Sequence, residues 1–206
     1  MKERNIFFDL DGTLLDSRER LYRLFQNLVP TSKLTFDDYW ALKRNKISHK
    51  EILINQFAYT AEDFTRFEQI WLNNIESPEW LSFDKPFEGV TAYLQELSKT
   101  YSLYIVTARQ FEDQALQQVD KFNWNRFFEK VFVTNGLQDK FELIANSIKT
   151  NSTDWLVGDT GKDIQTGKKL GVKTAAVFSG FLSKEVLMEY KPDVIASNVL
   201  ELNFNA

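Results

Sequence analysis

The chain has 206 residues, of which 43% are hydrophobic and 26% charged, as in an ordinary folded protein and unlike a disordered chain. Its formal charge of -4 argues against a protein that binds nucleic acid by neutralising phosphates. Cysteine is absent, which excludes disulfides and thiolate metal sites.

The N-terminal residues lead straight into an apolar run, which leaves no room for a signal peptide. No apolar run elsewhere approaches the length of a membrane span. We therefore expect a cytoplasmic protein that is bound to neither membrane nor nucleic acid.

The first predicted element is a buried strand at residues 6–8, followed by two carboxylates, Asp9 and Asp11. An apolar run without polar alternation is typical of a central strand covered on both faces. In an open parallel sheet, ligands bind beyond the carboxyl ends of the strands. Asp11-Gly12 is also a signal for a hairpin turn. A hairpin gives no reason for Asp9, so we favour a site.

From residue 16 to about residue 80 the pattern is helical throughout. Up to Pro30, apolar residues recur at i, i+3, i+4 and i+7, which marks one face of a helix. Three further helices start at capping signals: Thr35, Ser48 with Glu51, and Thr60 with Asp63. We find no convincing strand here and predict an all-helical insert at residues 16–81.

Beyond residue 86, predicted helices alternate with predicted strands at residues 103–107, 131–134, 155–158, 173–178 and 194–195. Strands separated by helices imply right-handed crossovers and a parallel sheet. The predicted fold class is therefore α/β, a Rossmann-like parallel sheet with helices on both faces. Residues 1–15 and 82–206 would form this core.

Polar residues follow successive strands, so their side chains would lie along one edge of the sheet. They are Asp9, Asp11, Thr107, Lys140, Asp159 and Asp163. Four carboxylates, a hydroxyl and a lysine suit a hard divalent cation and a phosphate. Singly, each has a structural explanation, such as a helix cap for Asp159 or a solvated first-turn acid for Asp163. For Arg109, just beyond the second strand, we keep the structural explanation.

Four segments resemble the four motifs of the haloacid dehalogenase superfamily, in its phosphatase branch. They are residues 8–17 (FDLDGTLLDS), residues 106–109 (VTAR), Lys140 and residues 157–163 (VGDTGKD). The similarity covers nearly the whole chain, with a helical cap inserted after the first motif. The chain departs from the family at Phe141, where proline is frequent, and in the cap loop at residues 43–49, which lacks glycine.

The resemblance implies that Asp9 is the nucleophile that forms an aspartyl-phosphate. Asp11 would be the general acid and then the base that activates water. Mg²⁺ would bind Asp9, the backbone carbonyl of Asp11 and Asp159, with Asp163 ligating through water or orienting the ligands. We expect these acids to converge with only Lys140 as a nearby cation, which would raise their pKa values.

The resemblance also implies residues that bind the rest of the substrate. The phosphate would be held by Thr107, Ala108 and Lys140. The cap should close over the mouth of the sheet, with hinges near residues 15–17 and 82–86. The candidates for contact with the non-reacting end of the substrate are Arg44, Lys46 and His49.

The function that this resemblance implies is a Mg²⁺-dependent phosphatase of a small phosphorylated metabolite, similar to the phosphoglycolate phosphatases and working as a monomer or weak homodimer. A phosphomutase of the β-phosphoglucomutase type has the same motifs and stays open. Dehalogenation of haloalkanoic acids is disfavoured, because that reaction needs neither a second acid such as Asp11 nor a metal cluster. A receiver-like binding module would also carry acids, a threonine and a lysine at strand ends, but the helical insert and Asp11 argue against it.

Overall fold

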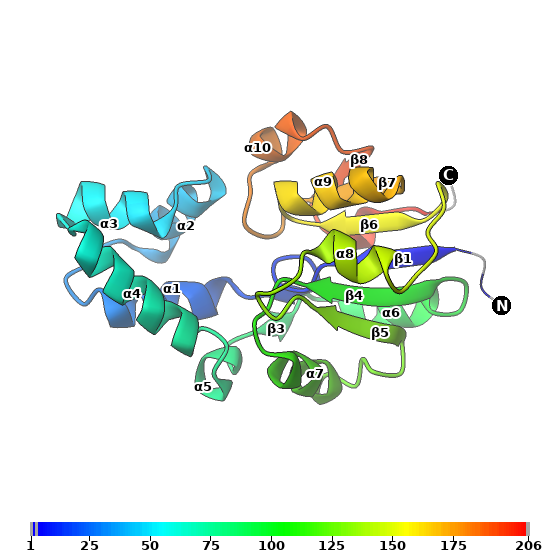
Figure 1. The fold of residues 1–206 in the computed structure, drawn as a ribbon, viewed down its shortest axis with the longest axis horizontal. Coiled ribbons are helices and arrows are strands. Elements are labelled where there is room, and N and C mark those ends of the chain that lie inside the picture. Colours follow the sequence, from blue (N-terminus) through cyan, green and yellow to red (C-terminus); the bar gives the residue numbers. More distant parts are fainter. Residues whose placement is uncertain (1, 3, 205–206) are drawn as a thin grey trace.

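The computed structural model describes residues 2 and 4–204, which form a helical region beside a layered α/β region (Figure 1). The main sheet has six parallel strands in the order β5-β4-β1-β6-β7-β8. Its strands are β1 (Asn5–Phe8), β4 (Ser102–Thr107), β5 (Phe128–Val133), β6 (Trp155–Gly158), β7 (Lys173–Val177) and β8 (Val194–Ala196). The predicted α/β class with a parallel sheet is confirmed.

Strand β1 lies in the middle of the sheet, paired in parallel with β4 and β6. Ile6 and Phe8 pack into one hydrophobic cluster and Phe7 into another, because successive side chains of a strand point to opposite faces. Both faces are covered, so the strand needs no polar alternation. Because β1 has a parallel partner on each edge, it forms no antiparallel hairpin, and the hairpin interpretation of Asp11-Gly12 is wrong.

Helices cover both faces of the sheet. Helices α6 (Val90–Leu97) and α7 (Glu112–Lys121) contribute Val90, Leu94 and Val119 to the cluster around Ile6. Helices α8 (Lys140–Ala145) and α9 (Gly161–Leu170) pack together, and Ile144 of α8 joins the cluster of Phe7. Helix α10 (Lys184–Glu189) and the 3₁₀ turn η1 (Val199–Glu201) follow.

The largest difference from a predicted strand boundary lies in β5. Strand β5 begins at Phe128 rather than residue 131, because it is an edge strand in which the exposed Glu129 and Lys130 mask the apolar pattern.

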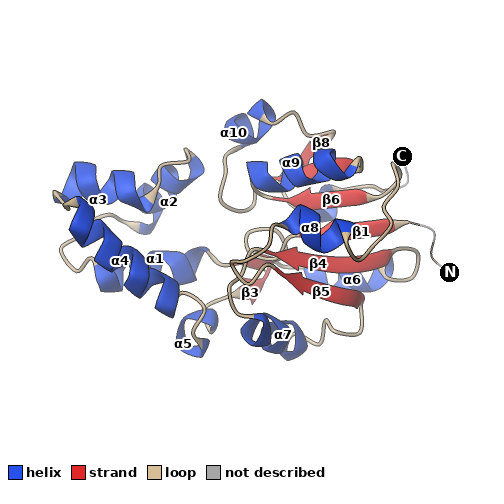
Figure 2. Ribbon diagram, in the orientation of Figure 1, coloured by secondary structure: helices blue, strands red, loops and turns tan. Residues whose placement is uncertain are grey.

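The helical region consists of α1 (Arg18–Leu28), α2 (Phe36–Arg44), α3 (His49–Phe57), α4 (Ala61–Asn74) and α5 (Pro78–Leu81) (Figure 2). Thr35, Ser48 and Thr60 cap α2, α3 and α4, as predicted, and all three form capping boxes. These helices have a hydrophobic cluster of their own. We call residues 18–81 the helical lobe; its independence as a domain stays a prediction. Within the described residues, no helix has the length and apolar character to cross a bilayer.

The chain passes between the sheet and the helical lobe twice, and the two passages pair with each other. Strand β2 (Leu15–Asp16) is antiparallel to β3 (Lys85–Pro86). Two residues are too few to give a periodic pattern, so neither strand was predictable. The carboxyl ends of the main strands face the helical lobe (Figure 1).

Candidate active site

Three of the four predicted acids meet at the carboxyl end of the sheet. Asp9 follows β1 and Asp159 follows the adjacent β6, with Phe8 in register with Val157. Asp163 lies in the first turn of α9. One carboxylate oxygen of each acid lies within 4.8 Å of the others, and all three side chains are buried. The parallel pairing of β1 with β6 therefore creates the cluster.

Lys140 and Thr13 complete this acidic cluster. The Lys140 Nζ lies 2.5 Å from Asp9 Oδ1 and 2.6 Å from Asp163 Oδ1. The Thr13 hydroxyl donates to Asp9 Oδ2 at 3.4 Å and reaches Asp159 Oδ1 at 3.5 Å. Burial alone would lower the pKa of Lys140, but the charges of Asp163 and Asp9 raise it above its usual value. Lys140 is thus a buried ammonium and not an exposed helix lysine.

The acidic cluster holds more negative charge than Lys140 can offset. Burial, with the charges of Asp163 and Asp11, raises the pKa of Asp9 to about 7 against the opposing effect of Lys140. Burial and the charges of Asp9 and Asp163 also raise the pKa of Asp159 well above its usual value. Three buried oxygen ligands with a deficit of positive charge fit a hard divalent cation.

Backbone groups hold two of these acids in place. Asp163 Oδ2 accepts hydrogen bonds from the amide and the hydroxyl of Thr160, so this acid also caps α9. Asp159 Oδ2 accepts a hydrogen bond of 2.7 Å from the Phe181 amide. A Cβ on Gly12 or on Gly180 would lie 2.3 or 2.0 Å from the same oxygen, so both close approaches require glycine.

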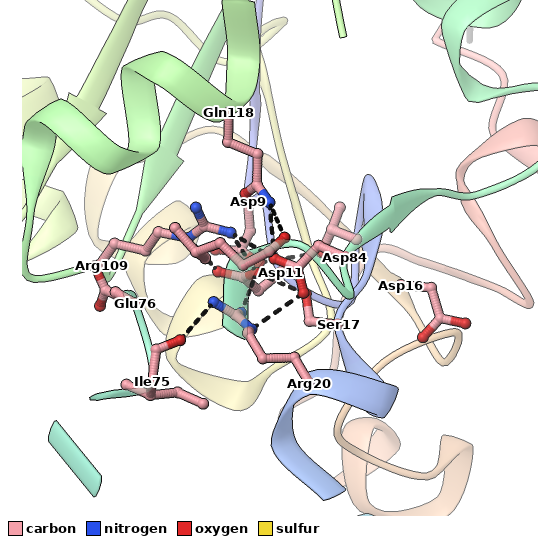
Figure 3. A network of polar contacts seen from close by, with 12 residues as sticks. Asp9, Asp11, Asp16, Ser17, Arg20, Ile75, Glu76, Asp84, Arg109 and Gln118 are labelled. Carbon is pink, nitrogen blue, oxygen red and sulfur yellow. Dashed lines mark hydrogen bonds and ion pairs between the residues drawn. The ribbon is translucent and has the colours of Figure 1, made fainter. Parts of the chain in front are cut away.

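Asp11 is not part of the acidic cluster and lies between two arginines (Figure 3). Arg109 contacts it in bidentate fashion, with Nε 2.8 Å from Oδ2 and Nη2 2.8 Å from Oδ1. Arg20 Nη2 and the Ser17 hydroxyl each lie 2.6 Å from Oδ1. Asp84 joins both arginines, 3.1 Å from Arg20 Nε and 3.2 Å from Arg109 Nη2.

This arrangement corrects two expectations. Burial would raise the pKa of Asp11, but Arg109 and Arg20 outweigh it and lower the pKa well below its usual range. Lys140 is therefore not the only nearby cation, and the prediction of a raised pKa is wrong for Asp11. Arg109, interpreted from the sequence as structural, contacts a predicted catalytic acid directly.

Sequence reasoning missed Arg20 and Asp84 altogether. Arg20 lies in the first turn of α1, where an arginine carries no distinctive signal. Asp84 lies just before Pro86, in a segment without periodicity. Only the folded chain brings these two residues to Asp11.

A cavity of about 970 Å³ lies between the helical lobe and the carboxyl end of the sheet. The predicted residues that line it include Asp9, Asp11, Thr107, Ala108, Lys140, Asp159 and Asp163. Thr107 is buried, whereas Ala108 is exposed. Four further lysines line the same cavity: Lys43, Lys46, Lys162 and Lys169. The walls therefore suit an anionic ligand although the whole chain is acidic.

The three residues predicted in the lobe for substrate contact have different surroundings. Lys46 lines the cavity, with Nζ 2.8 Å from the Tyr190 hydroxyl. Arg44 donates from Nη2 to the Phe178 carbonyl at 3.2 Å. His49 lies among the aromatic side chains of the lobe, 2.8 Å from the Tyr39 hydroxyl. Among the described residues, the lining of the cavity includes neither Arg44 nor His49.

Lys43, which the sequence did not indicate, is a better candidate for contact with the substrate than Arg44 or His49. It lines the cavity, and burial lowers its pKa to about 8. His49 is neutral near pH 7, because burial and the neighbouring Lys43 lower its pKa well below its usual value.

Comparisons with known proteins agree with this geometry. Residues 6–177 match the family model described as haloacid dehalogenase-like hydrolase. The pyrophosphatase PpaX of Halalkalibacterium halodurans is 24% identical, over 98% of this chain and 96% of that protein. The phosphoglycolate phosphatase of Mesorhizobium japonicum is 23% identical, over 94% of this chain and 90% of that protein.

The fold also matches a solved structure. A hydrolase of the haloacid dehalogenase-like family from Streptococcus pneumoniae superposes with a TM-score of 0.76 at 25% identity, covering 96% of this chain and 95% of that one. The chain is therefore an enzyme that belongs to the haloacid dehalogenase-like hydrolases.

Proposed function

We propose that this protein is a Mg²⁺-dependent phosphatase that hydrolyses a small phosphorylated metabolite through an aspartyl-phosphate on Asp9. The observation that carries the proposal is the buried cluster of Asp9, Asp159 and Asp163, which opens onto a lysine-lined cavity. Asp9 lies at the end of the central strand, and its Oδ1 pairs with the Lys140 ammonium. A carboxylate held this firmly is preorganised to attack a phosphorus atom placed beyond it.

The acidic cluster would hold the cation. Asp9, Asp159 and the backbone carbonyl of Asp11 would ligate it, and Asp163 would orient the ligands or bind through water. The ion supplies charge neutralisation between an anionic nucleophile and an anionic phosphate. Its binding would also relieve the unfavourable charge that raises the pKa values of Asp9 and Asp159.

Lys140, Thr107 and Ala108 would hold the transferring phosphoryl group. Lys140 is fully charged and joins Asp9 to Asp163, so it orients the nucleophile as well as attracting phosphate. The Thr107 hydroxyl and the backbone at Ala108 lie at the end of β4, on the same edge of the sheet. Such donors stabilise the charge that develops on the phosphoryl oxygens.

Asp11 would act as the general base that removes a proton from the water attacking the aspartyl-phosphate. The two arginines keep it ionised but also make it a weaker base, so this step is favoured when Asp11 loosens its contacts with them. Protonation of the leaving oxygen in the first step requires that Asp11 first loosen its contacts with Arg20 and Arg109. Arg20 belongs to the helical lobe, so movement of the lobe provides a route to that rearrangement.

The helical lobe would act as a cap that closes the cavity and contacts the non-reacting part of the substrate. Besides Arg20, which contacts Asp11, the lobe contributes Lys43 and Lys46 to the lining, so we propose these two lysines in place of Arg44 and His49. The relatives named above act on different substrates, a pyrophosphate in one name and phosphoglycolate in the other, at nearly equal identity. The proposal therefore stops at the class of small phosphorylated metabolites.

Turnover of p-nitrophenyl phosphate with and without Mg²⁺ tests the proposal. The parent should hydrolyse the ester only with the cation, and Asp9→Asn should have no measurable turnover, because no other group can form the covalent intermediate. Asp113→Asn is the matched control, because Asp113 is an exposed acid in the first turn of α7. Substantial activity in Asp9→Asn, or equal activity in chelator, would contradict the proposal.

A further inference from the structure

The loop of residues 178–182, which follows β7, lies against the acidic cluster. The amide of Phe181 donates its hydrogen bond to Asp159 Oδ2 at 2.7 Å. The hydroxyl of Ser179 donates to the Gly12 carbonyl at 2.8 Å. This loop therefore fixes the orientation of one carboxylate in the acidic cluster and braces the turn that follows β1.

The same loop also contacts the helical lobe. The ring of Phe181 packs edge-on against Trp40 of α2, with ring centroids 5.5 Å apart. The partly buried Phe181 also packs against the hydrophobic cluster of the lobe. Arg44 adds two hydrogen bonds to this contact. Its Nη2 donates to the Phe178 carbonyl, and its carbonyl accepts from the Ser183 amide at 3.0 Å. One residue, Phe181, thus contacts the lobe with its side chain and Asp159 with its backbone.

There is little free space between the loop and the acidic cluster. A Cβ on Gly180 would lie 2.0 Å from Asp159 Oδ2 and 2.7 Å from the Gly12 Cα. Packed contacts of this kind do not deform continuously, so a shift of Phe181 must move the Asp159 carboxylate or break its hydrogen bond. Separation of Trp40 from Phe181 would remove the support on the lobe side.

We propose that Phe181 is a positioning residue that couples docking of the helical lobe to the orientation of Asp159, so that the docked protein binds the divalent cation more tightly. The inference rests on the proposed function in one respect, that Asp159 ligates the cation. Coupling between two sites is reciprocal. Binding of the cation should therefore favour the docked lobe to the same extent.

Calorimetric titration of the full chain with Mg²⁺ tests the first half of this coupling. Phe181→Ala keeps the amide but loses the ring, and we expect its Mg²⁺ affinity to fall about tenfold, the lower end of the loss when support to a ligand is removed. Phe181→Tyr keeps the ring and should bind like the parent. Phe64→Ala is the matched control, since Phe64 is also half-buried and stacks on Phe67 within the lobe. If Phe181→Ala does not fold, Phe181→Leu replaces it, with a smaller loss expected.

Hydrogen exchange at the Ser183 amide tests the second half, because that amide bonds to the Arg44 carbonyl across the docked contact. Mg²⁺ should slow its exchange in the parent and not in Phe181→Ala. If Phe181→Ala binds Mg²⁺ like the parent while Asp159→Asn does not bind it, the coupling is overturned and the metal site stands. If Asp159→Asn binds Mg²⁺ like the parent, the ligand assignment in the proposed function fails first.

Discussion

Asp9 and Asp11 are two residues apart, yet they belong to clusters with different charge balance. Asp9 shares its surroundings with Asp159, Asp163 and a single cation, Lys140. Asp11 shares its surroundings with Asp84 and two arginines. The pKa of Asp9 is raised, mainly by burial, whereas the arginines lower that of Asp11. Three acids with one cation leave a deficit of positive charge, and two acids with two cations leave none.

The difference supports the two separate roles that we propose for Asp9 and Asp11, which the sequence places in one motif. A buried cluster with a cation deficit favours a divalent ion, whereas a neutral cluster favours a fixed, ionised carboxylate. Groups of one kind take different roles in catalysis when their environments separate their pKa values. Substitutions that change one cluster and spare the other test this assignment.

After the complete loss of turnover expected for Asp9→Asn, the largest expected effect is on activity and comes from Asp11→Asn. General acid–base catalysis contributes about 10²–10⁴-fold, so kcat for an alkyl phosphate should fall by that factor. p-Nitrophenyl phosphate should lose less in the first step, because its leaving group departs without a proton. Rapid-quench measurement of the aspartyl-phosphate separates the two steps. Asp16→Asn is the control, since Asp16 pairs with Arg18 instead. Equal kcat for parent and Asp11→Asn on both esters would refute the acid–base role.

The next effect is on stability and comes from Arg20→Met. Arg20 and Asp84 are almost fully buried, and removal of one partner from a buried pair costs about 3–5 kcal/mol. Arg20→Met with Asp84→Leu should be more stable than Arg20→Met alone, because the double variant also removes the buried acid that loses its partner. Urea unfolding measures both.

Arg23→Met is the control on the same helix. Its pair with Glu19 is exposed, and such pairs contribute about 0–1 kcal/mol. A cost for Arg20→Met no larger than that for Arg23→Met would mean that the cluster around Asp11 does not stabilise the fold.

The smallest effect concerns the cation. Mg²⁺ at a hundredfold excess over its dissociation constant should stabilise the parent by about 2.7 kcal/mol, and Asp159→Asn should lose most of that increment. In chelator, Asp159→Asn should melt no lower than the parent, because one of the mutually repelling acids is gone. Thermal melts with Mg²⁺ and with chelator check this; identical metal responses would mean that Asp159 is not a ligand.

The same variant has a predicted pH dependence. The pKa of Asp159 is raised from 3.8 in the folded protein, so above about pH 4 the folded state keeps a proton that the unfolded chain releases. Stability from this group therefore falls as pH rises, by up to about 1.4 kcal/mol per pH unit. Asp159→Asn lacks this loss. In chelator, its stability relative to the parent should increase from pH 4 to pH 7 in urea unfolding, and a constant difference would contradict the raised pKa.

Local signals in the sequence predicted most of the fold. The capping boxes at Ser48 and Thr60 were predictable because both partners lie within one helical turn. The buried strand at β1 and the acids beyond it were predictable because strand ends in a parallel sheet share one edge. Edge strand β5 was predicted less well, because its exposed residues obscure the apolar run.

The sequence by itself therefore determined the succession of strands and helices along the chain and the acids at the strand ends, because periodicity and capping depend on near neighbours. Only the tertiary structure decided which way each side chain faces. Asp11 meets Arg109 across 98 residues, and Asp159 meets Phe181 across a whole strand and helix. Likewise, Arg44 contacts the α/β region and His49 packs inside the lobe. Such contacts depend on how separate elements pack against each other, and a local sequence pattern holds no information on that packing.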